Sequence, residues 1–117
     1  MWFKSEKEKE DRANHASWAF DVRAVIHGIE YEFRTECQDA LDFERNFMGK
    51  IIIDKYRQKI YELKDEYKNS LYEKVVARMG KNRVGTIPEY LEREYERNIS
   101  DIADTFLHFC DVLQEQS

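Results

Sequence analysis

The chain has 117 residues, of which 37% are charged and 14% aromatic, and its net charge is −5 at pH 7. This length fits a single domain with one modest core. One proline and four glycines are too few for a turn-rich sheet protein, so we expect an all-α fold of long helices. The aromatic content argues against a disordered chain, because such side chains need a core that the charged residues surround.

The first predicted helix covers residues 5–48. Ser5 and Glu8 have the spacing of a capping box, in which both side chains bind free backbone N–H groups. Two neighbouring apolar stripes follow at helical spacing, and we expect both to be buried. Gly28 lies among them and predicts a kink or a close helix contact, because glycine costs about 1 kcal/mol relative to alanine inside a helix. The first stripe contains Trp18, Val22, Val25, Ile29, Phe33, Cys37, Ala40 and Phe47, and the second contains Ala16, Phe20, Ala24, His27 and Tyr31.

The second predicted helix covers residues 51–79, and Gly49 separates it from the first. An alternative is one continuous helix from Trp18 to Met79, which could bury its apolar stripe only in a dimer. We favour the break, because glycine more often ends a helix than continues one. The stripe of the second helix contains Ile53, Tyr56, Ile60, Leu63, Tyr67, Leu71 and Val75, and Gly80 marks its end.

The third predicted helix covers residues 87–115. Residues 81–85 are expected to form a loop, and Thr86 to Glu89 then give a capping box with Pro88 at an early position. The three helices predict an antiparallel up-down-up bundle within one domain, residues 1–117. Dimerisation into a larger bundle is the arrangement that would cover surplus apolar surface.

Charge is distributed unevenly along the chain. Residues 1–49, 50–83 and 84–117 carry net charges of −4, +5 and −6. The basic second helix can therefore form ion pairs with both acidic neighbours, and this structural interpretation is the one we prefer.

Four basic residues suggest an alternative, functional use of this charge. Lys74, Arg78, Lys81 and Arg83 gather near the predicted start of the third helix, whose free N–H groups also attract anions. A phosphorylated small molecule or a nucleotide could bind there. Nucleic acid is not expected as the main partner, because the domain as a whole is acidic.

An apolar ridge lies off the main stripe of the second helix. Tyr61 and Tyr72 are eleven residues apart, which places them within about 20° of each other around a helix, and Val76 extends the line. Tyrosine is frequent at interfaces. The ridge therefore either binds a partner or contacts a second neighbouring helix, and the sequence favours neither.

Histidine–carboxylate pairs are the candidates for a metal site. His27 and Glu30 form one pair and Asp104 and His108 the other. In an up-down-up bundle these pairs lie about 18 Å apart along the axis, whereas ligands lie within about 2.6 Å of one ion. We therefore expect no metal and no cofactor, and interpret His27 as a core histidine with one polar partner.

The remaining reactive residues do not form a catalytic pattern. Cys37 and Cys110 fall within apolar stripes, so we expect two reduced, structural thiols. No catalytic triad or phosphate-binding loop is recognisable, so we expect no enzyme. No run of 18 apolar residues and no signal-peptide pattern occurs, so we expect a cytoplasmic protein without membrane contact.

The expected function is that of a non-enzymatic helical interaction protein. Long two-faced helices, abundant tyrosine and the absence of recognisable chemistry favour a small regulator, inhibitor, immunity-type partner or adaptor. We expect a protein partner and self-association. The alternative is a binder of a phosphorylated small molecule or nucleotide at the four basic residues.

Overall fold

The computed structural model of the chain describes residues 6–48 and 52–116, and the side chains of residues 15–45 and 52–116. The described residues form helices and no strand, which confirms the all-α prediction. The predicted number of helices is wrong, because the second predicted helix and the loop after it form three separate helices. The helices are α1 (Glu6–Met48), α2 (Ile53–Asn69), α3 (Leu71–Met79), α4 (Lys81–Val84) and α5 (Glu89–Glu115).

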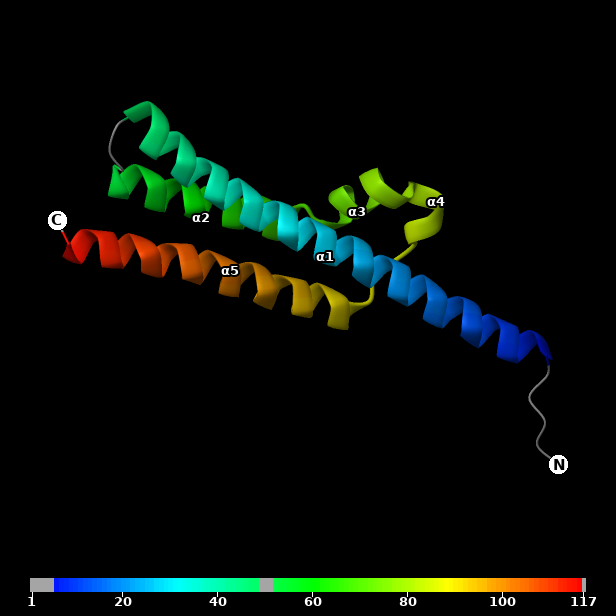
Figure 1. Cartoon of the computed structure of the whole chain (residues 1–117). Coiled ribbons are helices and arrows are strands. Elements are labelled where there is room, and N and C mark those ends of the chain that lie inside the picture. The colour runs from blue at the N-terminus through cyan, green and yellow to red at the C-terminus, as the bar shows by residue number, and fades with distance from the viewer. Residues whose placement is uncertain (1–5, 49–51, 117) are drawn as a thin grey trace.

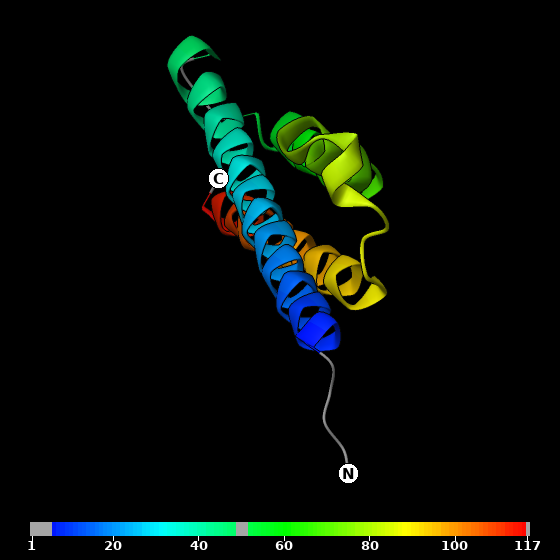
Figure 2. The ribbon, with the colours of Figure 1, turned by 90° about the vertical axis from the view of Figure 1, so that its right-hand side faces the viewer.

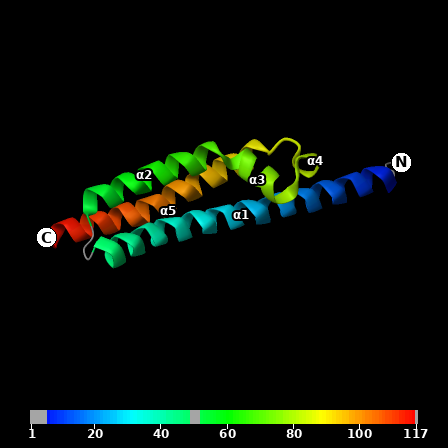
Figure 3. The same cartoon turned by 90° about the horizontal axis from the view of Figure 1, so that it is seen from above.

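Three of the helices, α1, α2 and α5, lie side by side along the molecule (Figures 1 and 3). α1 and α5 run in one direction and α2 runs in the other. α3 and α4 continue from α2 and cover the middle of α1 from one side (Figures 1 and 2). The N-terminal end of α1 extends beyond all the other helices, so the molecule is elongated, with extents of 73 × 26 × 18 Å.

The core contains the described residues of the first apolar stripe of α1 and of the stripe predicted for the second helix, together with apolar residues of α5. Phe33 and Cys37 of α1 are fully buried against α2 and α5. Three tyrosines are also fully buried, and each hydroxyl is hydrogen-bonded, as a buried polar group requires. The tyrosines are Tyr56, which donates to the Cys37 carbonyl at 3.0 Å, Tyr95, which donates to the Tyr67 carbonyl at 2.5 Å, and Tyr67, which contacts Glu32 at 3.2 Å.

The second apolar stripe of α1 is exposed, which corrects the prediction that both stripes are buried. Phe20 and Tyr31 are each 72% exposed to solvent. His27 is also exposed and is therefore not a core histidine. The physical reason is the number of neighbours: α2, α3 and α5 pack against the first stripe, and no described helix covers the second.

The predicted second helix is interrupted at Ser70. The Tyr95 hydroxyl from α5 donates to the Tyr67 carbonyl, which is the acceptor that the Leu71 N–H would use in an unbroken helix. The Ser70 hydroxyl also donates to the Glu66 carbonyl at 2.6 Å, and this local bond competes with the helical pattern. One tertiary and one local hydrogen bond thus occur together at the break between α2 and α3.

Gly80 ends α3 as predicted, but the expected loop after it is helical. Gly80 has φ +89°, a conformation that glycine adopts most easily. α4 follows at once, and its Val84 is fully buried. The Trp18 indole of α1 donates to the Arg83 carbonyl at 2.7 Å, which holds this short helix against α1.

The last helix begins at Glu89, two residues later than predicted. Pro88 is its N-cap, and the Pro88 carbonyl accepts hydrogen bonds from Leu91 and Glu92 at 3.0 and 3.2 Å. No side chain caps the helix, so the predicted capping box at Thr86 is wrong. The proline explains the shift, because it restricts the residue before it to extended conformations.

The remaining boundary predictions concern the first helix. α1 ends at Met48 and α2 begins at Ile53, which confirms the break and excludes one continuous helix. Gly49 itself and the predicted cap Ser5 lie outside the described residues, as does the side chain of Phe47.

Candidate functional site

The predicted ridge of Tyr61, Tyr72 and Val76 is divided between two helices. Tyr61 lies on α2 with 46% exposure, and Tyr72 lies on α3 with 44% exposure. Val76 is half-buried and packs against the core. The three residues therefore do not form one line along one helix, because the break at Ser70 comes between them.

The four basic residues of the predicted anion site, which we name the basic corner, lie on α3 and α4, and two of them lie against acidic residues of α1. Arg78 pairs with Glu32 and also donates to the Lys74 carbonyl at 3.1 Å. Arg83 lies 4.0 Å from Asp21. The Lys74 ammonium lies 4.4 Å from the centre of the Tyr67 ring. Lys74, Arg78 and Arg83 thus each contact another part of the chain. Lys81 is exposed on α4.

A polar cluster beneath the basic corner joins α1 to α2 and α3. The Tyr67 hydroxyl contacts the carboxylates of both Glu32 and Glu36. Burial and the hydrogen bond to Glu36 raise the pKa of Tyr67 above its ordinary value. The basic corner is therefore part of the contact that holds α3 to α1, in agreement with the structural interpretation of the charge pattern.

The exposed second stripe of α1 forms an apolar surface outside the core, and we name it the α1 aromatic face. It consists of Ala16, Phe20, Ala24, His27 and Tyr31. Two hollows between α1 and α5 lie along it, with volumes of about 200 and 220 Å³. The first is lined by Ala16, Ala19, Phe20, Arg23 and Tyr90, and the second by His27, Glu30, Tyr31, Arg34 and Ile102.

Polar side chains of α1 and α5 lie between these two hollows. Glu94 of α5 lies 3.4 Å from Arg23 and 3.7 Å from His27, both on α1. Glu30 is buried nearby and accepts two hydrogen bonds from Asn98, at 3.0 and 3.1 Å. Aromatic hollows with satisfied polar groups between them match the anatomy of protein interfaces.

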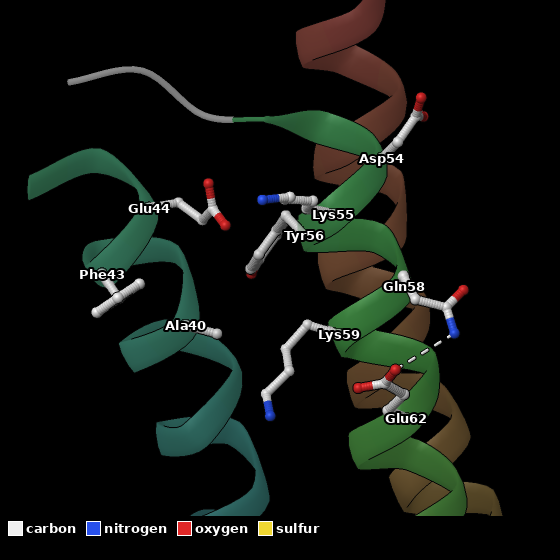
Figure 4. Close-up of a pocket in the computed structure, with 9 residues that line it drawn as sticks. All are labelled: Ala40, Phe43, Glu44, Asp54, Lys55, Tyr56, Gln58, Lys59 and Glu62. Carbon is white, nitrogen blue, oxygen red and sulfur yellow. Dashed lines mark hydrogen bonds between the residues drawn. The ribbon is translucent and has the colours of Figure 1, made fainter. Parts of the chain in front are cut away.

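A larger cavity of about 590 Å³ lies between the C-terminal part of α1 and the start of α2, and we name it the α1–α2 cavity (Figure 4). The apolar stripes of the sequence do not predict this cavity, because only Ala40 and Tyr56 of its residues belong to them. No sequence signal singles it out, since it arises from the separation of two helices. The cavity is lined by Ala40, Phe43, Glu44, Asp54, Lys55, Tyr56, Gln58, Lys59 and Glu62.

Both cysteines are buried and free, as predicted. Burial, with a smaller contribution from the nearby Glu36 carboxylate, raises the pKa of Cys37 to about 12. Burial likewise raises the pKa of Cys110. Because the thiolate is the nucleophilic form, neither thiol is suited to covalent catalysis near neutral pH.

Among the residues that the structure describes, no three His, Cys, Asp or Glu side chains are grouped so that they could hold a metal ion. None of the described helices is long and apolar enough to cross a membrane. Comparison of the chain with protein-family models, curated proteins and solved structures finds no match.

Proposed function

We propose that this chain is a non-enzymatic helical interaction protein, a small regulator, inhibitor, immunity-type partner or adaptor that acts through protein–protein contacts. The observation that carries the proposal is the α1 aromatic face, where Phe20 and Tyr31 are each 72% exposed on the same side of one helix. Single exposed apolar residues are ordinary on protein surfaces. Aromatic residues grouped along one face, with hollows beside them, instead favour a surface that a partner covers.

Self-association is the first contact that we expect of this face. Phe20 and Tyr31 lie at equal distances on either side of the middle of the face, between Ala24 and His27. In an antiparallel pair of α1 helices with two-fold symmetry, Phe20 of one copy therefore lies opposite Tyr31 of the other. The small Ala24 near the centre allows two helices to approach closely.

The alternative function, binding of a phosphorylated small molecule or nucleotide, has less support. An anion at the basic corner would have to displace Glu32 from Arg78 and compete with Asp21 for Arg83. Displacing bound carboxylates reduces the free energy that a phosphate could gain. We therefore base the proposed function on the α1 aromatic face.

Solution mass by light scattering, at two protein concentrations, tests the proposal. The variant Phe20→Ser/Tyr31→Ser should raise the dissociation constant of the assembly at least about 30-fold, because buried aromatic anchors contribute about 2 kcal/mol or more. The fold should persist, since both side chains are exposed. Tyr61→Ser/Tyr72→Ser tests the other exposed tyrosines, and Asp39→Ser, an exposed change on α1, is the control.

Each outcome bears on the proposal. A mass near twice the 14.2 kDa chain that is lost only in the Phe20→Ser/Tyr31→Ser variant supports self-association through this face. If the wild-type chain is monomeric, cross-linked partners from its own cell extract are compared between wild type and variants. Unchanged mass together with unchanged partner capture in both aromatic variants would contradict the proposed function.

A further inference from the structure

The α1 aromatic face is the middle of a longer line of residues on one side of α1. Residues spaced by threes and fours share one side of a helix, and this spacing continues from the face toward both ends of α1. The line covers residues 6–45, about 60 Å of helix. We name it the outer α1 line, and it consists of Glu6, Lys9, Ala13, Ala16, Phe20, Ala24, His27, Tyr31, Thr35, Gln38, Asp42 and Arg45.

The outer α1 line lies on the side of α1 that faces away from the core. The fully buried Val22, Ile29 and Phe33 are on the opposite side of the helix. Between residues 15 and 45, every member of the line is exposed except Asp42, which is half-buried. The N-terminal end of α1 also extends beyond the other helices (Figures 1 and 3). A second helix can therefore lie along the line without displacing α2, α3 or α5.

The charged residues of the outer α1 line lie at its two ends, in positions related by symmetry. Glu6 and Arg45 are equally far from the middle of the α1 aromatic face, and so are Lys9 and Asp42. Each of these two pairs combines opposite charges. Asp42 accepts a hydrogen bond from Gln38 at 3.1 Å, and neither Asp42 nor Arg45 forms an ion pair with another described residue.

This arrangement favours one way of pairing two copies of the line. In an antiparallel pair centred on the middle of the face, Glu6 of one copy lies opposite Arg45 of the other, and Lys9 lies opposite Asp42. Two-fold symmetry repeats both contacts, so four pairs of opposite charge result. A parallel pair in register instead places each charge against the same charge of the other copy, which is repulsive. A shift of the antiparallel pair by seven residues places the charges opposite uncharged residues.

We propose that α1 binds α1 of a second copy in antiparallel orientation along the whole outer α1 line. The apolar middle of the line supplies most of the affinity, and the charged ends determine the orientation and the register. The N-terminal end of α1, which extends beyond the other helices of its own chain, then packs along the C-terminal half of α1 in the other copy. This inference rests on the proposed function and adds the orientation, the register and the role of the N-terminal end of α1.

Two charge-exchange variants of the whole chain test the register, and each keeps the net charge. Glu6→Lys/Lys9→Glu exchanges the charges at one end of the line, and Asp42→Lys/Arg45→Glu exchanges them at the other. Either variant alone places like charges opposite each other at all four contacts. The dissociation constant, from light scattering at low ionic strength, should rise at least about tenfold in each.

An equal mixture of the two variants should assemble as the wild type does. In the mixed dimer all four contacts again join opposite charges, so the dissociation constant should return to within about threefold of the wild-type value. This recovery separates a contact between copies from a defect in folding, because mixing cannot repair a misfolded chain. Lys7→Glu/Asp11→Lys is the matched control, since it lies on the opposite side of α1 and should leave the dissociation constant unchanged.

Three results overturn this inference, and they differ from a failure of the proposed function. A dimer that is lost in Phe20→Ser/Tyr31→Ser but unchanged in both charge-exchange variants would mean that the α1 aromatic face pairs in another register. Weakened assembly that the mixture does not restore would mean that the charges act within one chain. A wild-type chain that is monomeric at its highest soluble concentration would exclude the second copy, whereas partner capture would still decide the proposed function.

Discussion

Individual tyrosines link the three long helices through their hydroxyl groups. Tyr56 of α2 donates to a carbonyl of α1, and Tyr95 of α5 donates to a carbonyl of α2. Each ring fills core volume while its hydroxyl satisfies a backbone acceptor, so one residue supplies both packing and a specific contact. Every polar side-chain atom that the structure describes as buried has a hydrogen-bond partner.

The Tyr95→Phe variant should be less stable by about 0.5 to 1.5 kcal/mol. It keeps the ring but removes the shorter of the two hydrogen bonds to the Tyr67 carbonyl, which the Ser70 N–H also contacts at 3.5 Å, so the cost is that of one hydrogen bond. Urea unfolding measures the change. Tyr61→Phe, on the exposed side of α2, is the control and should change the free energy of unfolding by less than about 0.5 kcal/mol.

An unchanged or increased stability of Tyr95→Phe would have a specific meaning. It would show that the Ser70 N–H, which lies 3.5 Å from the Tyr67 carbonyl, satisfies this acceptor without the Tyr95 hydroxyl.

At the scale of the elements, Gly80 is required by the backbone conformation at its position, whereas Gly28 is not. Gly28 lies inside α1, is exposed, and has no atom within 4 Å of the position that a Cβ would occupy. Nothing in the chain therefore requires glycine there, and the close helix contact that the sequence predicts is not made with another described helix. Gly80 has φ +89° between α3 and α4, where other residues are strained.

Alanine substitutions at these glycines should have opposite signs. Gly28→Ala should stabilise the chain by up to about 1 kcal/mol, because alanine is the better helix former. Gly80→Ala should destabilise it by about 1 kcal/mol or more, because an L-residue adopts positive φ only at a cost. Urea unfolding of both variants in parallel measures the difference. A destabilised Gly28→Ala that also assembles less would show that a second copy contacts this position.

At the scale of the whole molecule, one buried thiol and three buried tyrosine hydroxyls make the free energy of unfolding depend on pH. Burial raises the pKa of Cys37 to about 12 from an ordinary value of 9.0, and burial also raises the pKa values of Tyr56, Tyr67 and Tyr95 from 10.0. All four groups are neutral when protonated. The folded state therefore retains protons that the unfolded state has already lost above about pH 9.

The free energy of unfolding should consequently be unaffected by these groups below about pH 9 and fall from there toward pH 12. Each group contributes a slope of up to about 1.4 kcal/mol per pH unit where only the unfolded state has ionised. Urea unfolding at steps between pH 8 and 11 measures the fall. Tyr67→Phe should make the fall shallower, whereas Tyr31→Phe, an exposed tyrosine, should leave it unchanged. A free energy that is constant over this range would contradict the burial of these groups.

The positions of most helices and the burial of the first stripe of α1 could be predicted from the sequence, because they depend on local patterns. The spacing of Val22, Ile29 and Phe33 determines which side of α1 can be buried, and all three are. Gly80 predicted where α3 ends, since this helix ends at Met79. The same reasoning placed Cys37 and Cys110 in the core.

The exposure of the α1 aromatic face and the position of the α1–α2 cavity could not be predicted in this way. Periodicity indicates which residues of a helix share one side. It does not indicate whether another helix covers that side. Phe20 and Tyr31 are exposed because the described helices pack only against the other side of α1. The α1–α2 cavity with Lys55 and Lys59 depends on the separation between two helices, which no local pattern records.

The all-α fold, the end of α3 before Gly80 and the burial of the first stripe of α1 could be predicted from the sequence, because they follow from backbone propensity and from 3.6-residue periodicity. Tertiary packing determines the exposure of the α1 aromatic face and the contacts of the basic corner with α1, and it adds the hydrogen bond from Tyr95 to the local bond of Ser70 at the break after α2. These depend on groups far apart in the sequence, such as Tyr95 and the Tyr67 carbonyl, whose contact only the packing of helices creates.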